Sequence, residues 1–260
     1  MTQTVFQSRP LVIGALHLPD FALSRDRSVA WFEDYVVTNA HIFAKAGIPW
    51  VKLQDSTRTS GLAAPETLTM MASLGRLLRA EVPSIGFGII IEAHDPDAAL
   101  SVAHAAGADF VRLKVFVGGA MTAQGPRDGL GATAVACRAR LQRPDIALLA
   151  DVHDRTAVPL SGESQVVAAE WAAKTGADGL IITGASFADT LDRIAKLQST
   201  GVPRPILIGG GVDAGNVGQA LGAADGVVVS TALMRHDVEP DDILRWDIDR
   251  CRIFMDAARA

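Results

Sequence analysis

Short apolar runs alternate along the chain with longer segments whose apolar residues recur at helical spacing. Eight of these runs predict β-strands, at 11–17, 50–54, 85–91, 110–116, 146–152, 179–183, 205–210 and 226–230. Alternating strands and helices predict a parallel sheet, and eight such units predict a closed (β/α)8 barrel. An open doubly wound sheet is the alternative fold, but the GxGxxG turn that follows its first strand is absent here, because His17, Leu18 and Pro19 come instead.

Residues with known capping preferences mark the ends of the predicted helices. Asp95 followed by Pro96 predicts a helix start, and Ser186 with Asp189 forms a capping-box pattern. Gly-Ala-Asp recurs at 107–109 and 176–178, with a variant at 222–225. This recurrence predicts one repeated helix-to-strand turn, which belongs to the fold and not to the chemistry.

Four of the predicted strands carry two polar residues two positions apart near their C-terminal ends. Residues at i and i+2 of a strand share one face, so these side chains point into a common barrel interior. Charge buried there must be paired or bound to a ligand, so a functional site and an internal salt-bridge network are the two interpretations. The pairs are Lys52 with Gln54, Glu92 with His94, Arg112 with Lys114, and Asp151 with His153.

The D-x-H pair formed by Asp151 and His153 has two competing interpretations. Both side chains could ligate a divalent metal, with His17 or His94 completing the shell, since imidazole and carboxylate suit zinc or manganese. Asp151 could instead orient His153 as a general acid/base. His17 taken alone is equally compatible with a packed barrel histidine.

Two lysines face the predicted interior. Lys114 lies nearer the mouth and is assigned ligand contact, as a base, an electrophile or a Schiff-base nucleophile. Arg112 lies one layer deeper, where we expect it to pair with Glu92 or with a carboxylate on a neighbouring strand. For Lys52, a salt bridge to Glu92 competes with a substrate contact.

The last two strands predict an anion site. In barrels, the loops after strands seven and eight often bind phosphate through backbone N–H groups. Asp213 is expected to cap the helix that follows, and a tight turn is the alternative reason for the glycines. The predicted substrate-binding residues here are Gly209, Gly210, Gly211, Ser230 and Thr231, joined by Thr183 at the end of the sixth run. The glycine-rich segment 117–129 is expected to be a long loop, either a lid over the mouth or a mobile loop without catalytic duty.

Composition narrows the class of protein. The chain has 260 residues, 49% of them hydrophobic, and no low-complexity linker, so we expect one domain over residues 1–260. A net charge of −5 with interspersed signs excludes the basic face that nucleic-acid binding requires. Neither Cys137 nor Cys251 has metal or redox spacing, and both are read as helix residues. No apolar stretch is long enough to span a membrane and no signal peptide is apparent, so we expect a cytoplasmic protein.

Several segments together resemble the BtpA/SgcQ family of (β/α)8 proteins. They cover nearly the whole chain: IGALHLP (13–19), FVRLKVFVGGAMTAQG (110–125), LADVH (149–153), DGLIITG (178–184), IGGGVDAGNV (208–217) and ADGVVVSTAL (224–233). The resemblance implies a barrel fold. It also implies two kinds of role, because one branch is associated with photosystem I biogenesis or stability and others resemble sugar-metabolism proteins.

The chain departs from this family mainly around the predicted mouth. Gln54 and Asp55 stand where the family tends to have Glu-Asn, and Lys114 stands where it has Asn. After the third strand, Ala93-His94-Asp95 replaces the family's Arg-Asn-Asp. After the fifth strand, Arg155-Thr156 replaces Lys-His. The scaffold is kept while the mouth differs, which indicates a specialised substrate.

The sequence therefore predicts an enzyme that acts on a small phosphorylated metabolite, such as a sugar phosphate, by isomerase, epimerase or aldolase-type chemistry. Such reactions need an acid/base pair and a cation that holds the enolate. Asp151 and His153 are assigned proton transfer, Lys114 electrophilic or Schiff-base chemistry, and Glu92 a catalytic role beside them. The alternative is an assembly or stability factor of the BtpA type, with a partner surface hinted at by 31–37 and Trp246. These segments are more simply explained as helix faces packed on the barrel or as a homo-oligomer contact, and we expect the protein to form a homo-oligomer.

Overall fold

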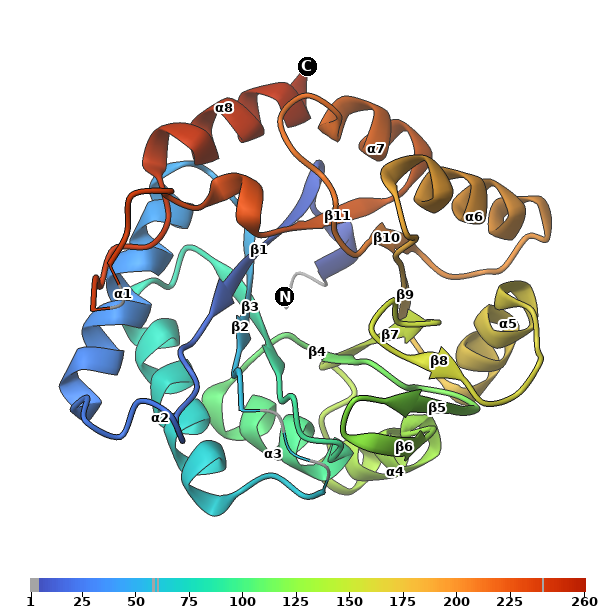
Figure 1. Ribbon diagram of the computed structural model, residues 1–260, viewed down its shortest axis with the longest axis horizontal. Coiled ribbons are helices and arrows are strands. Elements are labelled where there is room, and N and C mark those ends of the chain that lie inside the picture. The colour runs from blue at the N-terminus through green and yellow to red at the C-terminus, as the bar shows by residue number, and fades with distance from the viewer. Residues whose placement is uncertain (1–4, 58, 60, 240) are drawn as a thin grey trace.

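The computed structural model describes residues 5–57, 59, 61–239 and 241–260. Within them, eight parallel strands close into a barrel in the order β1-β11-β10-β9-β7-β4-β3-β2, surrounded by helices (Figure 1). The predicted (β/α)8 fold is confirmed, and the strand ends differ from the predicted ones by at most three residues. The barrel strands are β1 (Leu11–His17), β2 (Trp50–Gln54), β3 (Gly86–Ile90), β4 (Phe110–Leu113), β7 (Ala147–Val152), β9 (Gly179–Ile182), β10 (Ile206–Ile208) and β11 (Gly226–Val229).

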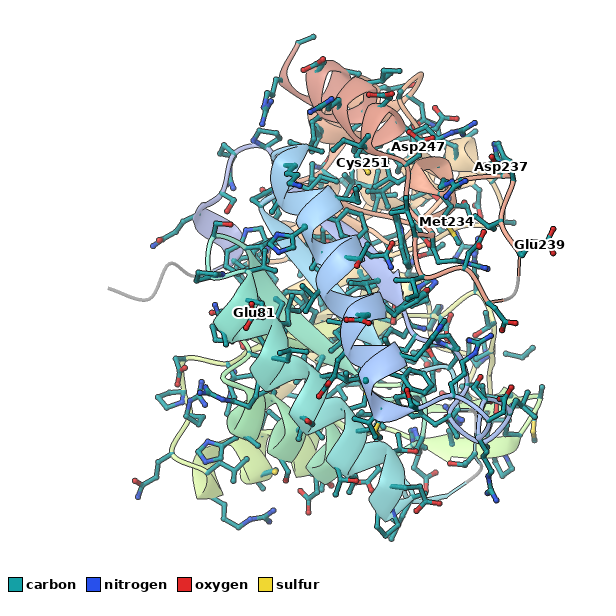
Figure 2. The ribbon with its side chains drawn as sticks, turned by 90° about the vertical axis from the view of Figure 1, so that its left-hand side faces the viewer. Glu81, Met234, Asp237, Glu239, Asp247 and Cys251 are labelled. Atoms are coloured by element: carbon teal, nitrogen blue, oxygen red, sulfur yellow. The ribbon has the colours of Figure 1, made fainter. Side chains whose placement is uncertain are left out.

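The helices lie on the outside of the barrel, and α1 and α2 run side by side along its wall (Figure 2). Asp95 and Ser186 cap α3 and α6 through side-chain oxygens, and Gly107 and Gly176 end α3 and α5 at positive φ, so the predicted caps are confirmed. The long helices are α1 (Val29–Lys45), α2 (Pro65–Glu81), α3 (Pro96–Ala106), α4 (Gly131–Arg140), α5 (Gln165–Thr175), α6 (Phe187–Ser199), α7 (Val217–Ala223) and α8 (Ile248–Arg259).

The three Gly-Ala-Asp-type turns each connect a barrel strand to one neighbouring strand at the amino ends of the strands. Asp109 accepts a hydrogen bond from the backbone N–H of Phe87, and Asp178 accepts one from Leu148 N–H. Asp225 does the same for Ile206 N–H. These carboxylates satisfy donors at the starts of neighbouring strands, which explains why the turn recurs.

The lower half of the barrel interior is apolar. Trp50, Phe110 and Leu149 pack there with Val5 of the short helix η1 (Val5–Gln7), which closes the bottom. Gly88 leaves room for this packing, since a Cβ on it would lie 2.2 Å from the Phe110 ring. Nearer the carboxyl ends of the strands, the inward-facing residues are polar. The alternation along each strand therefore places these polar side chains at the open end of the barrel.

A small antiparallel sheet covers one side of the mouth. Its strands are β5 (Gly119–Thr122), β6 (Gly125–Asp128) and β8 (Val158–Pro159). The segment 117–129, expected to be a loop, is therefore mostly a β-hairpin. Its turn is fixed locally, because Thr122 accepts a hydrogen bond from Gln124 N–H and donates one to the Gly125 carbonyl.

The aromatic residues of 31–37 pack mostly inward. Phe32 and Tyr35 are buried, and Tyr35 meets the buried Trp246 edge to face with ring centroids 6.1 Å apart. The buried members of this segment and Trp246 fit the interpretation of a helix face packed on the barrel. Cys137 and Cys251 are buried in α4 and α8 as expected. In the part of the chain that the structure describes, no helix combines the length and apolar character needed to cross a membrane.

Candidate active site at the barrel mouth

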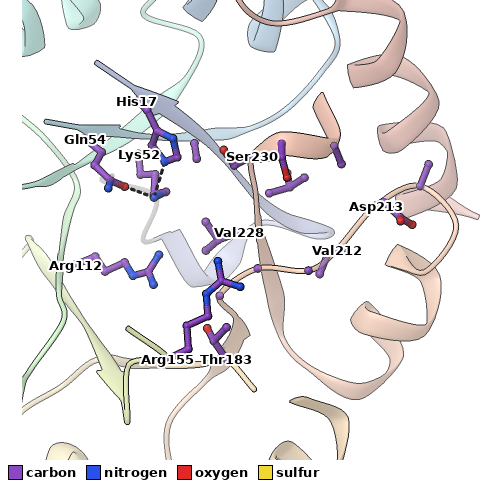
Figure 3. Close-up of a pocket in the computed structure, with 18 of the residues that line it drawn as sticks. His17, Lys52, Gln54, Arg112, Arg155, Thr183, Val212, Asp213, Val228 and Ser230 are labelled. Carbon is purple, nitrogen blue, oxygen red and sulfur yellow. Dashed lines mark hydrogen bonds between the residues drawn. The ribbon is translucent and has the colours of Figure 1, made fainter. Parts of the chain in front are cut away.

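A cavity of about 990 Å³ opens at the carboxyl ends of the barrel strands (Figure 3). Because the polar residues sit at the ends of parallel strands, closure of the barrel brings them to one opening. The cavity is lined by most of the predicted site residues, namely His17, Lys52, Gln54, Arg112, Lys114, Thr183, Gly209, Gly210, Gly211, Ser230 and Thr231.

Lys52 lies deep in this cavity on β2. Its side chain is buried, with its Nζ 3.3 Å from His17 Nε2 and donating a hydrogen bond to Gln54 Oε1. Burial lowers the pKa of Lys52 well below its ordinary value, and the nearby Arg112 cation lowers it further. Burial also lowers the pKa of His17 to about 3, helped by the charge of Lys52, so this imidazole is neutral at neutral pH.

Gln54 separates Lys52 from the nearest carboxylate. The Gln54 amide donates from Nε2 to Glu92 Oε1 at 2.6 Å, while its carbonyl accepts from Lys52. Glu92 Oε2 in turn accepts a 2.7 Å hydrogen bond from Lys114 Nζ. The salt bridge considered for Lys52 and Glu92 is thus replaced by a relay through Gln54, and Lys114 forms an ion pair with Glu92.

Arg112 and Asp151 form a two-pronged ion pair inside the barrel. Arg112 Nε and one Nη each donate a 2.8 Å hydrogen bond to a different oxygen of Asp151. This confirms the expectation that Arg112 pairs with a carboxylate on a neighbouring strand. Both Asp151 oxygens are engaged with the guanidinium, an arrangement that differs from the predicted pairing of Asp151 with His153.

The two outer histidines lie away from the main cavity. His153 follows the end of β7 with a φ of 54°, so the strand alternation breaks and its ring faces Glu163, with Nε2 3.5 Å from Oε1. His94 Nε2 lies 2.7 Å from the carbonyl oxygen of Asp128 on β6. The metal site considered for Asp151 and His153 is not formed, and among the described residues no three His, Cys, Asp or Glu side chains gather as a metal site.

The glycine segment after β10 forms one wall of the cavity. A Cβ on Gly209 would lie 2.1 Å from Thr183 Oγ1, and Gly211 has a φ of +75°, so both positions require glycine. Gly210 has open space around it. Beside this segment, at the end of the neighbouring strand β11, the buried Ser230 hydroxyl has no hydrogen-bond partner among the described residues. Asp213 accepts from the N–H of Gly215 and fixes the loop rather than capping α7 directly.

Other cavity residues were not identified from the sequence as part of the site. Arg155 and Thr156 reach it from the loop after β7, and His236 and Arg250 reach it from the segment after β11 and the first turn of α8. Arg155 stands two residues after the D-x-H pair and differs from the related family, which is the one signal that could have identified it. Nothing in the local sequence marks His236 or Arg250.

Comparison with known proteins gives consistent results. The BtpA family model matches residues 8–260. An uncharacterised protein of Pyrococcus abyssi is 32% identical over 232 residues, covering 86% of this chain and 87% of that protein. The photosystem I biogenesis protein BtpA of Synechocystis is 28% identical, covering 89% of this chain and 83% of that protein. A tryptophan synthase chain from Mycobacterium tuberculosis aligns over 99% of this chain and 98% of its own length, with a TM-score of 0.65 and 14% identity, which shows the shared fold.

Proposed function

The chain belongs to the BtpA family, and we propose that it is an enzyme acting on a small phosphorylated carbonyl compound, such as a sugar phosphate. The proposed reaction is an isomerisation, epimerisation or aldol-type step. The observation that carries the proposal is one cavity with two different ends. An exposed glycine backbone and an unpartnered hydroxyl form one end, and a buried lysine with a lowered pKa lies at the other.

The phosphate is assigned to the glycine end. Gly210 and Gly211 let backbone N–H groups approach an anion without side-chain obstruction. Ser230 has a hydroxyl whose hydrogen-bonding capacity is unused in the protein, and Thr231 begins the short helix η2 (Thr231–Leu233) beside it. A phosphate satisfies that hydroxyl at little cost, since the group is already buried.

The reacting carbonyl is assigned to Lys52, which replaces Lys114 as the favoured nucleophile. An amine must be unprotonated to attack a carbonyl, and a lowered pKa makes that form more available. Lys114 instead contacts the Glu92 carboxylate directly. Attack by Lys52 and loss of water give an imine, which accepts the electron pair released when the neighbouring C–H or C–C bond breaks.

Supporting roles follow from the contacts. The neutral His17 ring, 3.3 Å from Lys52 Nζ, orients the amine, and the proton that the attacking amine releases passes to the carbonyl oxygen, which leaves as water. Lys114 lines the cavity and stabilises a developing oxyanion, the electrophilic role. Asp151 keeps Arg112 in position, and His153 and His94 have no direct contact with the reacting groups in this proposal.

Borohydride trapping tests the proposal. The protein is incubated with dihydroxyacetone phosphate, glyceraldehyde 3-phosphate and fructose 6-phosphate, each beside its phosphate-free counterpart, and then reduced. We expect a stable adduct on Lys52 with a phosphorylated compound, found by intact mass and peptide mapping. Lys52→Met abolishes it, while Lys114→Met and the exposed-site control Lys174→Met retain it. Adducts spread over surface lysines, or none on Lys52 with any compound, contradict the imine mechanism.

A second candidate function is an assembly or stability factor, favoured by the name of the Synechocystis relative. This function needs a macromolecular partner and no turnover. The two candidates separate experimentally, because Lys52→Met removes enzymatic activity but has no reason to weaken a partner bound on the outer surface.

A further inference from the structure

Two guanidinium groups in the cavity lack a partner among the residues that the structure describes. Arg155 and Arg250 both line the cavity, and neither side chain forms a hydrogen bond or an ion pair with any residue that the structure describes. Arg112, in contrast, is fully engaged with Asp151. Two unpaired cations facing one pocket indicate a ligand with negative charge, since guanidinium groups bind carboxylates and phosphates through matched N–H donors.

The carboxylates of the cavity wall form no ion pair with these cations. Asp154 accepts hydrogen bonds from the backbone N–H and the hydroxyl of Thr156, and Asp213 accepts from its own loop. The inner cations Arg112 and Lys114 already have carboxylate partners. Arg155 and Arg250 are therefore two cations on the cavity wall that no carboxylate of the described residues contacts directly, although the chain as a whole is acidic.

The two arginines stand on different parts of the mouth. Arg250 belongs to α8, which follows β11, and so lies on the side of Ser230 and Thr231. Arg155 follows β7, and in the barrel order β9 and β10 separate β7 from β11. Figure 3 shows the Arg155 side chain pointing into the cavity from the side of Thr183. Neighbouring strands lie about 4.8 Å apart, so the starting points of the two side chains are on the order of 10 Å or more apart.

We propose that the substrate carries two anionic groups, a phosphate at the glycine end beside Arg250 and a second anion, carboxylate or phosphate, held by Arg155. This inference rests on the proposed function for the phosphate end and narrows its substrate class. Arg155 is then a specificity-determining residue, because a substrate with a single anion leaves its guanidinium without a partner.

Binding of matched probes tests this inference by titration calorimetry. The phosphate-only probes are inorganic phosphate and glycerol 3-phosphate. The two-anion probes are phosphoglycolate, 3-phosphoglycerate and 6-phosphogluconate, which place a carboxylate at increasing distance, and fructose 1,6-bisphosphate, which places a second phosphate. We expect at least one two-anion probe to bind about tenfold more tightly than glycerol 3-phosphate, as a two-pronged arginine contact gives.

Arg155→Gln should remove this preference and leave the affinity for inorganic phosphate nearly unchanged. Arg252→Gln is the matched control, because Arg252 is an exposed arginine on α8 outside the cavity wall. If the preference persists in Arg155→Gln, or if no two-anion probe exceeds glycerol 3-phosphate, the second-anion site is wrong. If no phosphate compound binds at all, both the second-anion site and the proposed function are wrong. Binding of phosphate without a two-anion preference contradicts the second-anion site alone, so the two failures are distinguishable.

Discussion

Lys52 Nζ lies 3.3 Å from His17 Nε2, although each side chain is able to carry a positive charge. The contact persists because burial disfavours both charged forms and lowers the pKa of each. β1 and β2 pair in register with Ala15 opposite Lys52, so the proximity is built into the barrel wall. A lysine held without a direct carboxylate partner is the feature on which the proposed chemistry depends.

Lys52 should titrate below every ordinary lysine in the protein. The chain has five lysines, so Cε-labelled lysine gives a spectrum simple enough to follow from about pH 6 to pH 11. We expect one Cε signal to move well below the usual lysine range and to vanish in Lys52→Arg. Lys174→Arg should remove a different signal and leave the low-titrating one in place. A Lys52 signal that titrates in the usual range would show that burial does not activate the amine.

His17 should make the protein sensitive to acid. Its folded pKa is about 3 and its unfolded pKa about 6.5, so between these values the unfolded chain binds a proton that the folded protein excludes. The free energy of unfolding therefore falls as the pH drops through this window, by up to about 1.4 kcal/mol per pH unit from this group. Urea unfolding should show a shallower loss for His17→Gln than for the wild type, with the exposed-site variant His104→Gln as control. Equal slopes in all three proteins would contradict this assignment.

The sequence predicts the scaffold well because its signals are local. Alternation within each strand places Lys52 and Arg112 on the inner face. The glycines after β10 predict the turn that they form. The partner of Asp151 is a different case. Arg112 is 39 positions away and meets Asp151 only across the β4–β7 pairing, whereas His153 is two positions away but lies past the end of β7. The position of Arg155 depends on the path of a loop, which no residue pattern specifies.

Replacing Asp55 by asparagine should stabilise the protein above neutral pH. Burial raises the pKa of Asp55 to about 7, although its carboxylate accepts hydrogen bonds from the N–H groups of Glu92 and Thr57. Between the unfolded pKa of 3.8 and the folded value of about 7, the folded state binds the extra proton, so stability falls as the pH rises. Asp55→Asn keeps an acceptor without the charge.

The free energy of unfolding measured with urea should therefore be higher for Asp55→Asn than for the wild type at pH 8 and equal to it near pH 4. The difference can grow by at most about 1.4 kcal/mol per pH unit, because one proton is involved. Asp55→Ala is the control, because it loses the acceptor as well and should be less stable than Asp55→Asn at both pH values. An asparagine variant that is less stable than the wild type at pH 8 would show that the charge itself is needed.

The Arg112–Asp151 pair should show strong coupling in a double-mutant cycle. Arg112→Met or Asp151→Leu alone leaves a buried unpaired charge and should cost about 3–5 kcal/mol, while the double variant should cost much less than the sum. The exposed Arg143–Asp145 pair is the matched control and should couple by less than about 1 kcal/mol. Additive losses at Arg112 and Asp151 would mean that the two groups do not depend on each other.

Alanine at each glycine of the 209–211 segment should separate folding from ligand binding. Gly209→Ala brings a Cβ within 2.1 Å of Thr183 Oγ1 and should destabilise the barrel, and Gly211→Ala should cost about 1–2 kcal/mol because its φ is +75°. Gly210→Ala meets no atom within 4 Å, so its stability should equal that of the wild type, yet its methyl group enters the space assigned to the phosphate. Calorimetry with inorganic phosphate should then show weaker binding to Gly210→Ala at unchanged thermal stability. Unchanged affinity would place the phosphate away from this segment, because a bound anion in contact with the Gly210 backbone has no room for the added carbon.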